Sequence, residues 1–351
     1  MSSVPVSFES VAVSTRMRLA RNFADYPFPW RLLKDTHAEE QAQEIVRLIT
    51  ATLSKVDQFT LYEMKHVSDE RTALLLERNL ISRDLVRNRR ISAALISSDE
   101  IISVMLNEED HVREQYFMRG FDLPRAWERI TGLDDAISDS VPFAFDEQFG
   151  YLTACPTNLG TGLRASVMLF LPALSRQGTM AREIVPELLR LGLTARGAYG
   201  EGSGAEGDLF QVSNEVTLGV SEEKILTIVG QAVGLIVEEE LLGRARMKAE
   251  GGLQLRDKVS RAYGILTNCR VLEEHEFLRY LADVKLGLAL GYYSDGSEDD
   301  AWMAQLDELA ATLRPANINR LNGAPLDKQG QDAYRADYAR TAIRAMQLQT
   351  D

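Results

Sequence analysis

The chain has 351 residues, a net charge of −13, 45% hydrophobic residues and 26% charged residues. These values are typical of a folded protein of two or three domains, and they exclude disorder along the whole chain. The longest nearly apolar run, residues 165–174, is too short to cross a bilayer, so no membrane partner is expected. The acidic balance argues against direct binding of nucleic acid.

The N-terminal residues 1–10 have neither the basic flank nor the apolar stretch of a secretory signal. The two cysteines, Cys155 and Cys269, are too few for a disulfide framework or a cysteine zinc site. The sequence therefore predicts a cytoplasmic protein with reduced thiols.

Arginine dominates the basic residues: the chain has eight lysines and 31 arginines, with no lysine between Lys65 and Lys224. An anionic ligand of this central stretch would be bound by arginine, whose planar set of donors suits phosphate oxygens. An arginine-rich codon bias explains the same composition equally well.

Helix and strand signals alternate irregularly through the first 250 residues. Thr36 and Glu39 form a capping-box pair, and the apolar residues that follow at helical spacing predict a helix over 35–55. The further expected elements are a strand over 59–66, a helix over 69–80, strands over 91–97 and 101–107, a β-prone stretch over 143–153, a strand over 165–171, a helix over 180–191, a strand over 210–219 and a helix over 221–248.

The pattern changes after Gly251 and Gly252. Helical signals without a clear strand cover residues 253–266, 271–290, 299–313 and 331–348. We therefore expect an α+β fold. A mainly antiparallel sheet flanked by helices would occupy residues 1–250, and a small all-helical domain would occupy residues 251–351.

Several familiar sites are absent from the sequence. No Gly-Lys pair exists, which excludes the nucleotide-binding P-loop, and the His-Arg-Asp and Asp-Phe-Gly motifs of serine, threonine and tyrosine kinases are missing. The four histidines lack metal-ligand spacing, so no protein metal site is expected. Residues 202–207 match the dinucleotide fingerprint formally, but they precede a strand, so a flexible glycine-rich loop is the better interpretation.

Two segments in the first third of the chain concentrate polar side chains. In an extended segment over 14–22, Arg16 and Arg18 point to the same side and suit a polyphosphate, with a solvated strand edge as the alternative. The segment 107–113 places three adjacent carboxylates directly after an apolar strand. These suit a cation, and the alternative is an exposed acidic turn.

Two more such segments follow. Residues 155–166 place a thiol before a rigid turn and Arg164 at the start of an apolar strand, where arginine needs an anionic partner. A buried structural cysteine is the alternative for Cys155. Residues 196–201 lead into the glycine-rich loop and suit either a loop that closes over a ligand or a plain surface loop.

The order and joint presence of these segments resemble the phosphagen (guanidino) kinase family over about residues 10–240. That family carries Arg-x-Arg, Asn-Glu-Glu-Asp-His-x-x-Arg, Cys-Pro-[Ser/Thr]-Asn-x-Gly-Thr and Arg-Gly-x-x-Gly-Glu in this order. Creatine and arginine kinases have a helical domain before Arg-x-Arg, whereas here that segment begins at Ser14 and the helical region is C-terminal. This layout, with the stretch 19–29, resembles the bacterial protein-arginine kinases of the McsB family.

The resemblance implies transfer of the γ-phosphoryl group of ATP to arginine side chains in proteins, which would mark proteins for protease-linked quality control and stress regulation. The alternatives are a kinase for a free guanidino metabolite and a regulatory adaptor of a chaperone-protease or stress repressor. Such a transfer requires cations around the triphosphate and carboxylates that accept a proton from the guanidinium. The implied cofactors are ATP and Mg²⁺, the latter held mainly by phosphates.

The resemblance also assigns the site residues. Glu109, as base, and Glu201 clamp the guanidinium, Cys155 lies beside it, and Arg164 completes the catalytic set. The implied ATP-binding residues are Ser14, Thr15, Arg16, Met17, Arg18, Asn79, Arg113, Arg164, Ala165, Ser166, Val167, Met168, Arg196, Gly197, Ala198, Tyr199, Gly200 and Glu201.

The C-terminal region carries the regulatory expectations. Protein-arginine kinases often have an Arg-Asp-x-x-Arg-Ala element that binds phosphoarginine, and the matching positions here are Gln331, Asp332, Arg335 and Ala336. Gln331 replaces the first arginine, so product binding would be weaker or lost; the alternative is a plain helix start.

The implied partners are protein substrates with exposed arginines, an activator protein, a Clp-type chaperone-protease, a stress transcription repressor and a second copy of the chain. A homodimer is expected because the C-terminal helices have more apolar surface than a small domain would readily cover. The residues that suggest this surface are Phe277, Leu278, Leu281, Leu286, Leu288 and Leu290.

Overall fold

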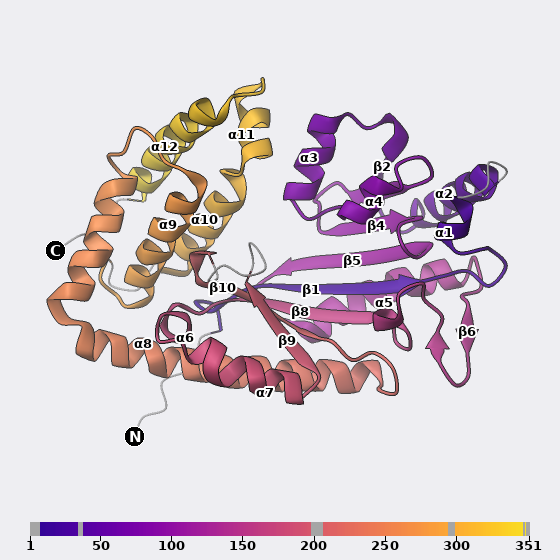
Figure 1. Cartoon of the computed structure of the whole chain (residues 1–351), viewed down its shortest axis with the longest axis horizontal. Coiled ribbons are helices and arrows are strands. Elements are labelled where there is room, and N and C mark those ends of the chain that lie inside the picture. The colour runs from indigo at the N-terminus through magenta and orange to yellow at the C-terminus, as the bar shows by residue number, and fades with distance from the viewer. Residues whose placement is uncertain (1–7, 34–37, 198–205, 294–298, 347, 349–351) are drawn as a thin grey trace.

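A large antiparallel sheet forms the centre of the protein (Figure 1). The computed structural model describes residues 8–33, 38–197, 206–293, 299–346 and 348. The strand order is β2-β3-β4-β5-β1-β8-β10-β9, and every neighbouring pair is antiparallel. The strands are β1 (Ala12–Arg21), β2 (Phe59–Glu63), β3 (Ala93–Ser97), β4 (Ile102–Leu106), β5 (Val112–Arg119), β8 (Leu163–Phe170), β9 (Leu193–Gly197) and β10 (Leu209–Asn214), with a separate hairpin of β6 (Phe145–Asp146) and β7 (Gly150–Tyr151).

One face of the sheet is packed against three long helices: α2 (Ala38–Leu53), α5 (Leu123–Ser138) and α8 (Glu222–Leu266). Alternate residues of the central strands, among them Met17 and Val167, are fully buried there. Because successive strand residues point to opposite faces, the residues between them point to the other face of the sheet. This alternation decides which polar side chains are available to a ligand.

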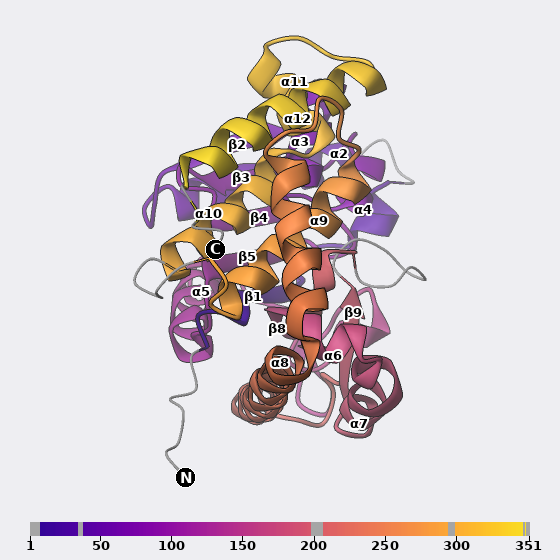
Figure 2. The ribbon, with the colours of Figure 1, turned by 90° about the vertical axis from the view of Figure 1, so that its left-hand side faces the viewer.

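The remaining helices connect the strands or form the C-terminal region. They are α1 (Pro29–Leu32), α3 (Asp69–Glu77), α4 (Arg83–Arg87), α6 (Pro172–Arg176), α7 (Val185–Arg190), α9 (Glu274–Ala289), α10 (Asp299–Thr312), α11 (Pro315–Asn322) and α12 (Lys328–Ala345). In Figure 1, α8 runs beneath the sheet and then turns toward the other C-terminal helices. Figure 2 shows these helices in front of the sheet.

The predicted α+β class is confirmed, but several element bounds differ. The strand expected over 59–66 ends at Glu63, and residues 64–66 form a 3₁₀ turn instead. The strand expected over 210–219 ends at Asn214, whose side-chain amide donates to the carbonyls of Leu163 and Val216 and so replaces the strand pairing. The β-prone stretch 143–153 contributes two short strands only.

Helix bounds also differ where a local cap or break was not anticipated. Residues 180–184 form a π-helical turn, and α7 follows it. Helix α12 begins at Lys328 rather than at residue 331, because the Asp327 carboxylate accepts a hydrogen bond from the Gly330 amide at 2.7 Å. Helix α11 was not predicted. Thr36 of the predicted capping box lies outside the described residues.

Helix α8 consists of two helical segments that meet at a kink close to the proposed domain boundary near residue 250. Gly252 interrupts its helical geometry, with φ 46° and ψ −140°, a conformation that favours glycine. The helices after this point share a second hydrophobic core, which also includes Phe170 from β8. No helix in the described part of the chain is long and apolar enough to cross a membrane.

The apolar residues from which a dimer was predicted lie inside this second core. Phe277, Leu286 and their neighbours are at most 4% exposed, because α8, α10 and α12 cover them within one chain. The argument from uncovered apolar surface is therefore wrong. The hydrophobic spacing of α9 reflects packing inside the C-terminal region rather than an exposed face.

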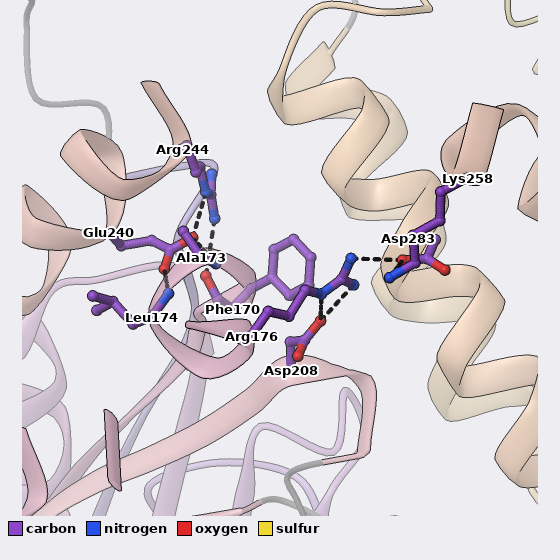
Figure 3. A network of polar contacts seen from close by, with 9 residues as sticks. All are labelled: Phe170, Ala173, Leu174, Arg176, Asp208, Glu240, Arg244, Lys258 and Asp283. Atoms are coloured by element: carbon purple, nitrogen blue, oxygen red, sulfur yellow. Dashed lines mark hydrogen bonds and ion pairs between the residues drawn. The ribbon is translucent and has the colours of Figure 1, made fainter. Parts of the chain in front are cut away.

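Polar contacts hold helix α6, which follows β8, against α8 and against the C-terminal region (Figure 3). The Glu240 carboxylate accepts hydrogen bonds from the amides of Ala173 and Leu174, both at 3.0 Å, and from Arg244 at 2.7 Å. Arg176 extends this junction, because it pairs with Asp208 and with Asp283 of α9. The start of α6 thus takes its cap from α8, as the backbone amides of a helix start require.

Replacing Glu240 by alanine is expected to lower the free energy of unfolding by about 3–5 kcal/mol, since Arg244 and two amides would lose their partner in a buried site. Urea denaturation of the full chain measures the change. The control is Glu239→Ala, because Glu239 is the exposed neighbour on the same helix. Equal stability of the two variants would contradict the capping role.

Candidate active site

The strand register brings five arginines to one face of the sheet. Residues directly opposite each other in antiparallel strands share a face. Arg18 of β1 lies opposite Gln115 of β5 and Arg164 of β8, and the alternation continues to β9 through Gln211. The arginines on this face, called here the arginine face, are Arg16, Arg18, Arg113, Arg164 and Arg196.

Several donors on the arginine face lack a partner. The Nε atoms of Arg16, Arg18 and Arg164 are buried and, among the described residues, have no hydrogen-bond acceptor. Burial and the neighbouring arginines lower the pKa of Arg16 to about 10 and hold the pKa of Arg18 well below its ordinary value. Buried donors and mutually repelling cations are stabilised by an anion, so the face fits a polyphosphate.

Arg113 and Arg196 differ from the other three arginines. Arg113 donates to both oxygens of the buried Glu108 carboxylate, at 2.8 and 3.0 Å. Burial alone would lower the pKa of Arg113, but Glu108 offsets this effect and raises it overall. The Arg196 side chain is 57% exposed, and its guanidinium nitrogen lies 4.0 Å from a carboxylate oxygen of Glu215. Arg196 is close in sequence to residues 198–205, which the structure does not describe. One arginine is therefore held firmly, and the other is exposed at the end of β9.

The predicted nucleotide-binding stretches are divided between the two faces of the sheet. Ser14, Ser166 and Met168 lie on the arginine face, because they are paired in register with its residues. Thr15, Met17, Ala165 and Val167 point into the core and are fully buried. The side chains of this second group do not reach the arginine face, so a contact with a nucleotide would involve their backbone only.

Most of the acidic motif holds its own turn in place. Asn107, at φ 56°, donates to the carbonyls of Ala42 and Ile91, both at 3.1 Å. The Asp110 carboxylate accepts from Asn22 at 2.6 Å. His111 Nδ1 accepts from the Phe23 amide at 3.0 Å, and burial lowers the pKa of His111 to about 4, so the imidazole is neutral. These residues are structural.

Glu109 is the exposed carboxylate at the tip of this turn. Partial desolvation, followed by the neighbouring Glu108 and Asp84 carboxylates, raises its pKa. A carboxylate with a raised pKa, surrounded by like charges, attracts a cation and accepts a proton more readily than an isolated one. Of the motif's three carboxylates, Glu109 is thus the one available to a guanidinium.

Asp110 also positions the cysteine segment. Its carboxylate accepts a hydrogen bond from the Ala154 amide at 2.6 Å, which holds Cys155 near the turn that carries Glu109. The Cys155 Sγ lies 3.0 Å from Thr157 Oγ1 and is partly accessible. Gly160 allows this segment to pack closely, because a Cβ atom there would lie 2.3 Å from the Thr217 carbonyl oxygen. The structure therefore places the segment that carries Cys155 beside the turn that carries Glu109.

Two residues of the arginine face were missed by sequence reasoning. Gln115 accepts a hydrogen bond from Arg16 and donates to the Asn79 carbonyl at 2.8 Å. Phe117 is 43% exposed on the same face. Strand alternation from Arg113 would have identified both positions. Asn79, one of the predicted ATP-binding residues, adopts φ 56°, and its backbone carbonyl accepts the hydrogen bond from Gln115.

Part of the predicted site is not described. Gly197 ends β9, while Ala198, Tyr199, Gly200 and Glu201 lie outside the described residues. Within the described ranges, no group of three or more His, Cys, Asp or Glu side chains is arranged to hold a metal ion. A divalent cation at the arginine face would be held by oxygen atoms of the polyphosphate bound there.

The predicted phosphoarginine element lies at a separate cavity of about 340 Å³ in the C-terminal region. Gln331, Asp332 and Arg335 line this cavity together with Glu273, Glu274, His275, Pro315 and Lys328. Arg335 is almost fully buried and donates to Asp332 at 2.7 Å and to the Leu272 carbonyl at 2.9 Å. Ala336 does not line the cavity; it is fully buried in the second core.

The arginine face therefore has the donors and the positive charge that suit a polyphosphate ligand. Residues 41–242 match the family described as ATP:guanido phosphotransferase, C-terminal catalytic domain, and residues 252–351 match the protein-arginine kinase McsB C-terminal domain. The chain belongs to the ATP:guanido phosphotransferase family, in the branch that carries the McsB C-terminal domain. Arg16 and Arg18 precede the matched range.

Known relatives agree with this assignment. The chain is 38% identical to a protein-arginine kinase of Caldanaerobacter subterraneus subsp. tengcongensis, covering 95% of this chain and 97% of the relative. It is 41% identical to that of Geobacillus thermodenitrificans, covering 95% and 90%. Among solved structures, a lombricine kinase is 25% identical, with a TM-score of 0.58 and coverage of 68% of this chain and 69% of the other.

Proposed function

We propose that this protein is an ATP-dependent protein-arginine kinase, which transfers the γ-phosphoryl group of ATP to the guanidinium of arginine side chains. The observation that carries the proposal is the arginine face, whose buried donors have no acceptor among the residues that the structure describes. Relatives named protein-arginine kinase that match 95% of the chain support the choice of acceptor.

The arginine face would bind the triphosphate. Arg16, Arg18 and Arg164 would donate to phosphate oxygens with their Nε atoms, which have no acceptor in the described part of the chain. Arg113 would add a donor whose position Glu108 determines. Charge spreads over the transferred oxygens in the transition state, so prearranged cations stabilise it. Mg²⁺, held mainly by the phosphates and water, would neutralise further charge.

The acceptor arginine would bind at the acidic turn. Its guanidinium is protonated at neutral pH, so a nitrogen becomes nucleophilic only when a carboxylate aligns it and takes a proton. We assign this role to Glu109, and Cys155 would stabilise the cation from the neighbouring segment. Glu201, assigned from the family resemblance, would complete the clamp.

Protein substrates follow from the proposed activity. A role in protease-linked quality control and stress regulation, an activator protein, a Clp-type chaperone-protease, a stress transcription repressor and a homodimer stay predictions from the family resemblance. We also place the protein in the cytoplasm, where its two unpaired cysteines would remain reduced.

The deciding experiment supplies Mg-ATP with either free arginine or an arginine-rich protein. The control substrate is the same protein with lysine in place of each arginine. We expect phosphate on the arginine protein that is lost in acid, because an N–P bond is acid-labile. Product from free arginine alone would identify a metabolite kinase, and binding to a chaperone-protease without phosphoryl transfer would identify an adaptor.

Replacing Glu109 by glutamine is expected to lower kcat by about 10²–10⁴-fold, as loss of a positioned base does, with ATP affinity nearly unchanged. Steady-state kinetics and calorimetric titration of ATP separate the two effects. Glu147→Gln, which neutralises an exposed carboxylate in the β6–β7 hairpin, serves as the control. Normal turnover in the Glu109 variant would remove this residue from the mechanism.

Arg164→Lys is expected to reduce both ATP affinity and turnover although the charge is kept. An ammonium group cannot reproduce the planar, bidentate geometry of guanidinium. The matched change Arg125→Lys alters an exposed arginine of α5 and should leave both quantities unchanged. A lysine variant with normal affinity and rate would show that charge alone suffices at position 164.

The C-terminal cavity is proposed to bind phosphoarginine weakly. Phosphoarginine presents a guanidinium and a phosphoryl group, and the cavity offers carboxylates beside Lys328 and Arg335. Arg335 already donates to Asp332 and Leu272, and the Gln331 amide donates to Asn319 and Leu326. Few donors therefore remain for the phosphoryl group.

Gln331→Arg is expected to strengthen binding of free phosphoarginine by about tenfold or more, since a charged hydrogen bond to the phosphoryl group would be gained. Calorimetric titration of both proteins measures the change. Gln329→Arg adds the same charge to an exposed position of α12 and is the control. If neither Gln331→Arg nor the unmodified chain binds, the cavity is not a phosphoarginine site.

A further inference from the structure

Helix α11 takes its N-terminal cap from the catalytic region. Its own N-cap residue, Arg314, makes no capping side-chain hydrogen bond, and Pro315 follows at the first helical position. The Glu77 carboxylate, at the end of α3, accepts hydrogen bonds from the amides of Ala316 at 2.8 Å and Asn317 at 3.1 Å. Figures 1 and 2 show α3 and α11 on the same side of the molecule. One carboxylate therefore ties the two regions together.

The chain on both sides of this cap is also held. The Arg314 guanidinium donates to the Glu77 carbonyl at 2.9 Å, and the buried Arg335 donates to the Leu313 carbonyl at 3.0 Å. The first turn of α11 is thus bound to α3 on one side and to α12 on the other. A carboxylate at a helix N-terminus is favoured by the aligned backbone dipoles, which makes the contact directional.

A second set of contacts leads from Glu77 to the arginine face. Asn79, two residues after Glu77, is held at φ 56°, and its carbonyl accepts from Gln115 Nε2 at 2.8 Å. The Gln115 side-chain oxygen accepts from Arg16. The side-chain amide of Gln115 makes both contacts. A shift of the Asn79 carbonyl would therefore rotate this amide and displace the oxygen that accepts from Arg16.

We propose that Glu77 is a positioning residue for ATP binding, which couples the C-terminal region to Arg16 through Asn79 and Gln115. This inference rests on the proposed role of the arginine face. The catalytic site would then depend on the docking of α11, so that any event that displaces α11 weakens nucleotide binding. Two hydrogen bonds and two residues of backbone connect Glu77 to Arg16, and measured coupling between these positions is what tests the proposal.

The test compares Glu77→Gln with Glu70→Gln, which neutralises an exposed carboxylate on the same helix. Calorimetry measures ATP affinity in the full chain, and thermal unfolding measures stability. We expect ATP to bind about fivefold or more weakly in Glu77→Gln, with kcat at saturating ATP nearly unchanged, and a partial recovery in Glu77→Asp. A lower Tm with unchanged ATP affinity would show a purely structural cap and would overturn the proposal.

A double-mutant cycle tests the path itself. If Glu77 acts through Gln115, adding Glu77→Gln to Gln115→Ala should weaken ATP binding little further, whereas additive losses would overturn the proposed path. Arg16→Ala separates the two proposals. Lost ATP binding in Arg16→Ala with normal binding in Glu77→Gln refutes only the coupling. Normal binding in Arg16→Ala refutes the assignment of the arginine face as well.

Discussion

The arrangement of like charges on one face of the sheet is the constraint on which the rest of the structure depends. Arg16, Arg18 and Arg164 lie on two adjacent strands, partly out of water, where cations repel one another strongly. A protein does not gain stability from such a set. An anion beside the arginines would offset this repulsion, and without one the fold must hold the arginines in place through other contacts.

Those contacts come from the opposite face of the sheet and from the acidic turn. On the opposite face, Arg21 is buried and paired with Asp134 at 2.9 Å, and its guanidinium lies 3.6 Å from the centre of the Tyr151 ring. In the acidic turn, Glu108 fixes Arg113, and Asp110 joins the turn to the cysteine segment. These two carboxylates hold neighbouring groups of the protein in position, whereas Glu109 is the exposed carboxylate of the motif.

The C-terminal region contacts the catalytic region through the apolar side chain of Phe170 and through polar groups at two places. Arg176 joins Asp208, at the start of β10, to Asp283 of α9, and Glu77 caps α11. Polar junctions of this kind are directional, because each hydrogen bond fixes the relative position of the groups that it joins.

The sequence by itself determined the α+β class, the helical C-terminal region, and the family, because motif order and hydrophobic period are local properties of the chain. It also placed Arg16 and Arg18 on one side of an extended segment. It did not reveal that Gln115 lies on the arginine face or that residues 165–168 alternate between the two faces of the sheet. It also did not reveal that Phe277 and Leu286 are buried within the core of a single chain. Only the tertiary structure decided these points, and with them the cap that Glu77 provides for α11, because strand register and helix packing join residues far apart in sequence.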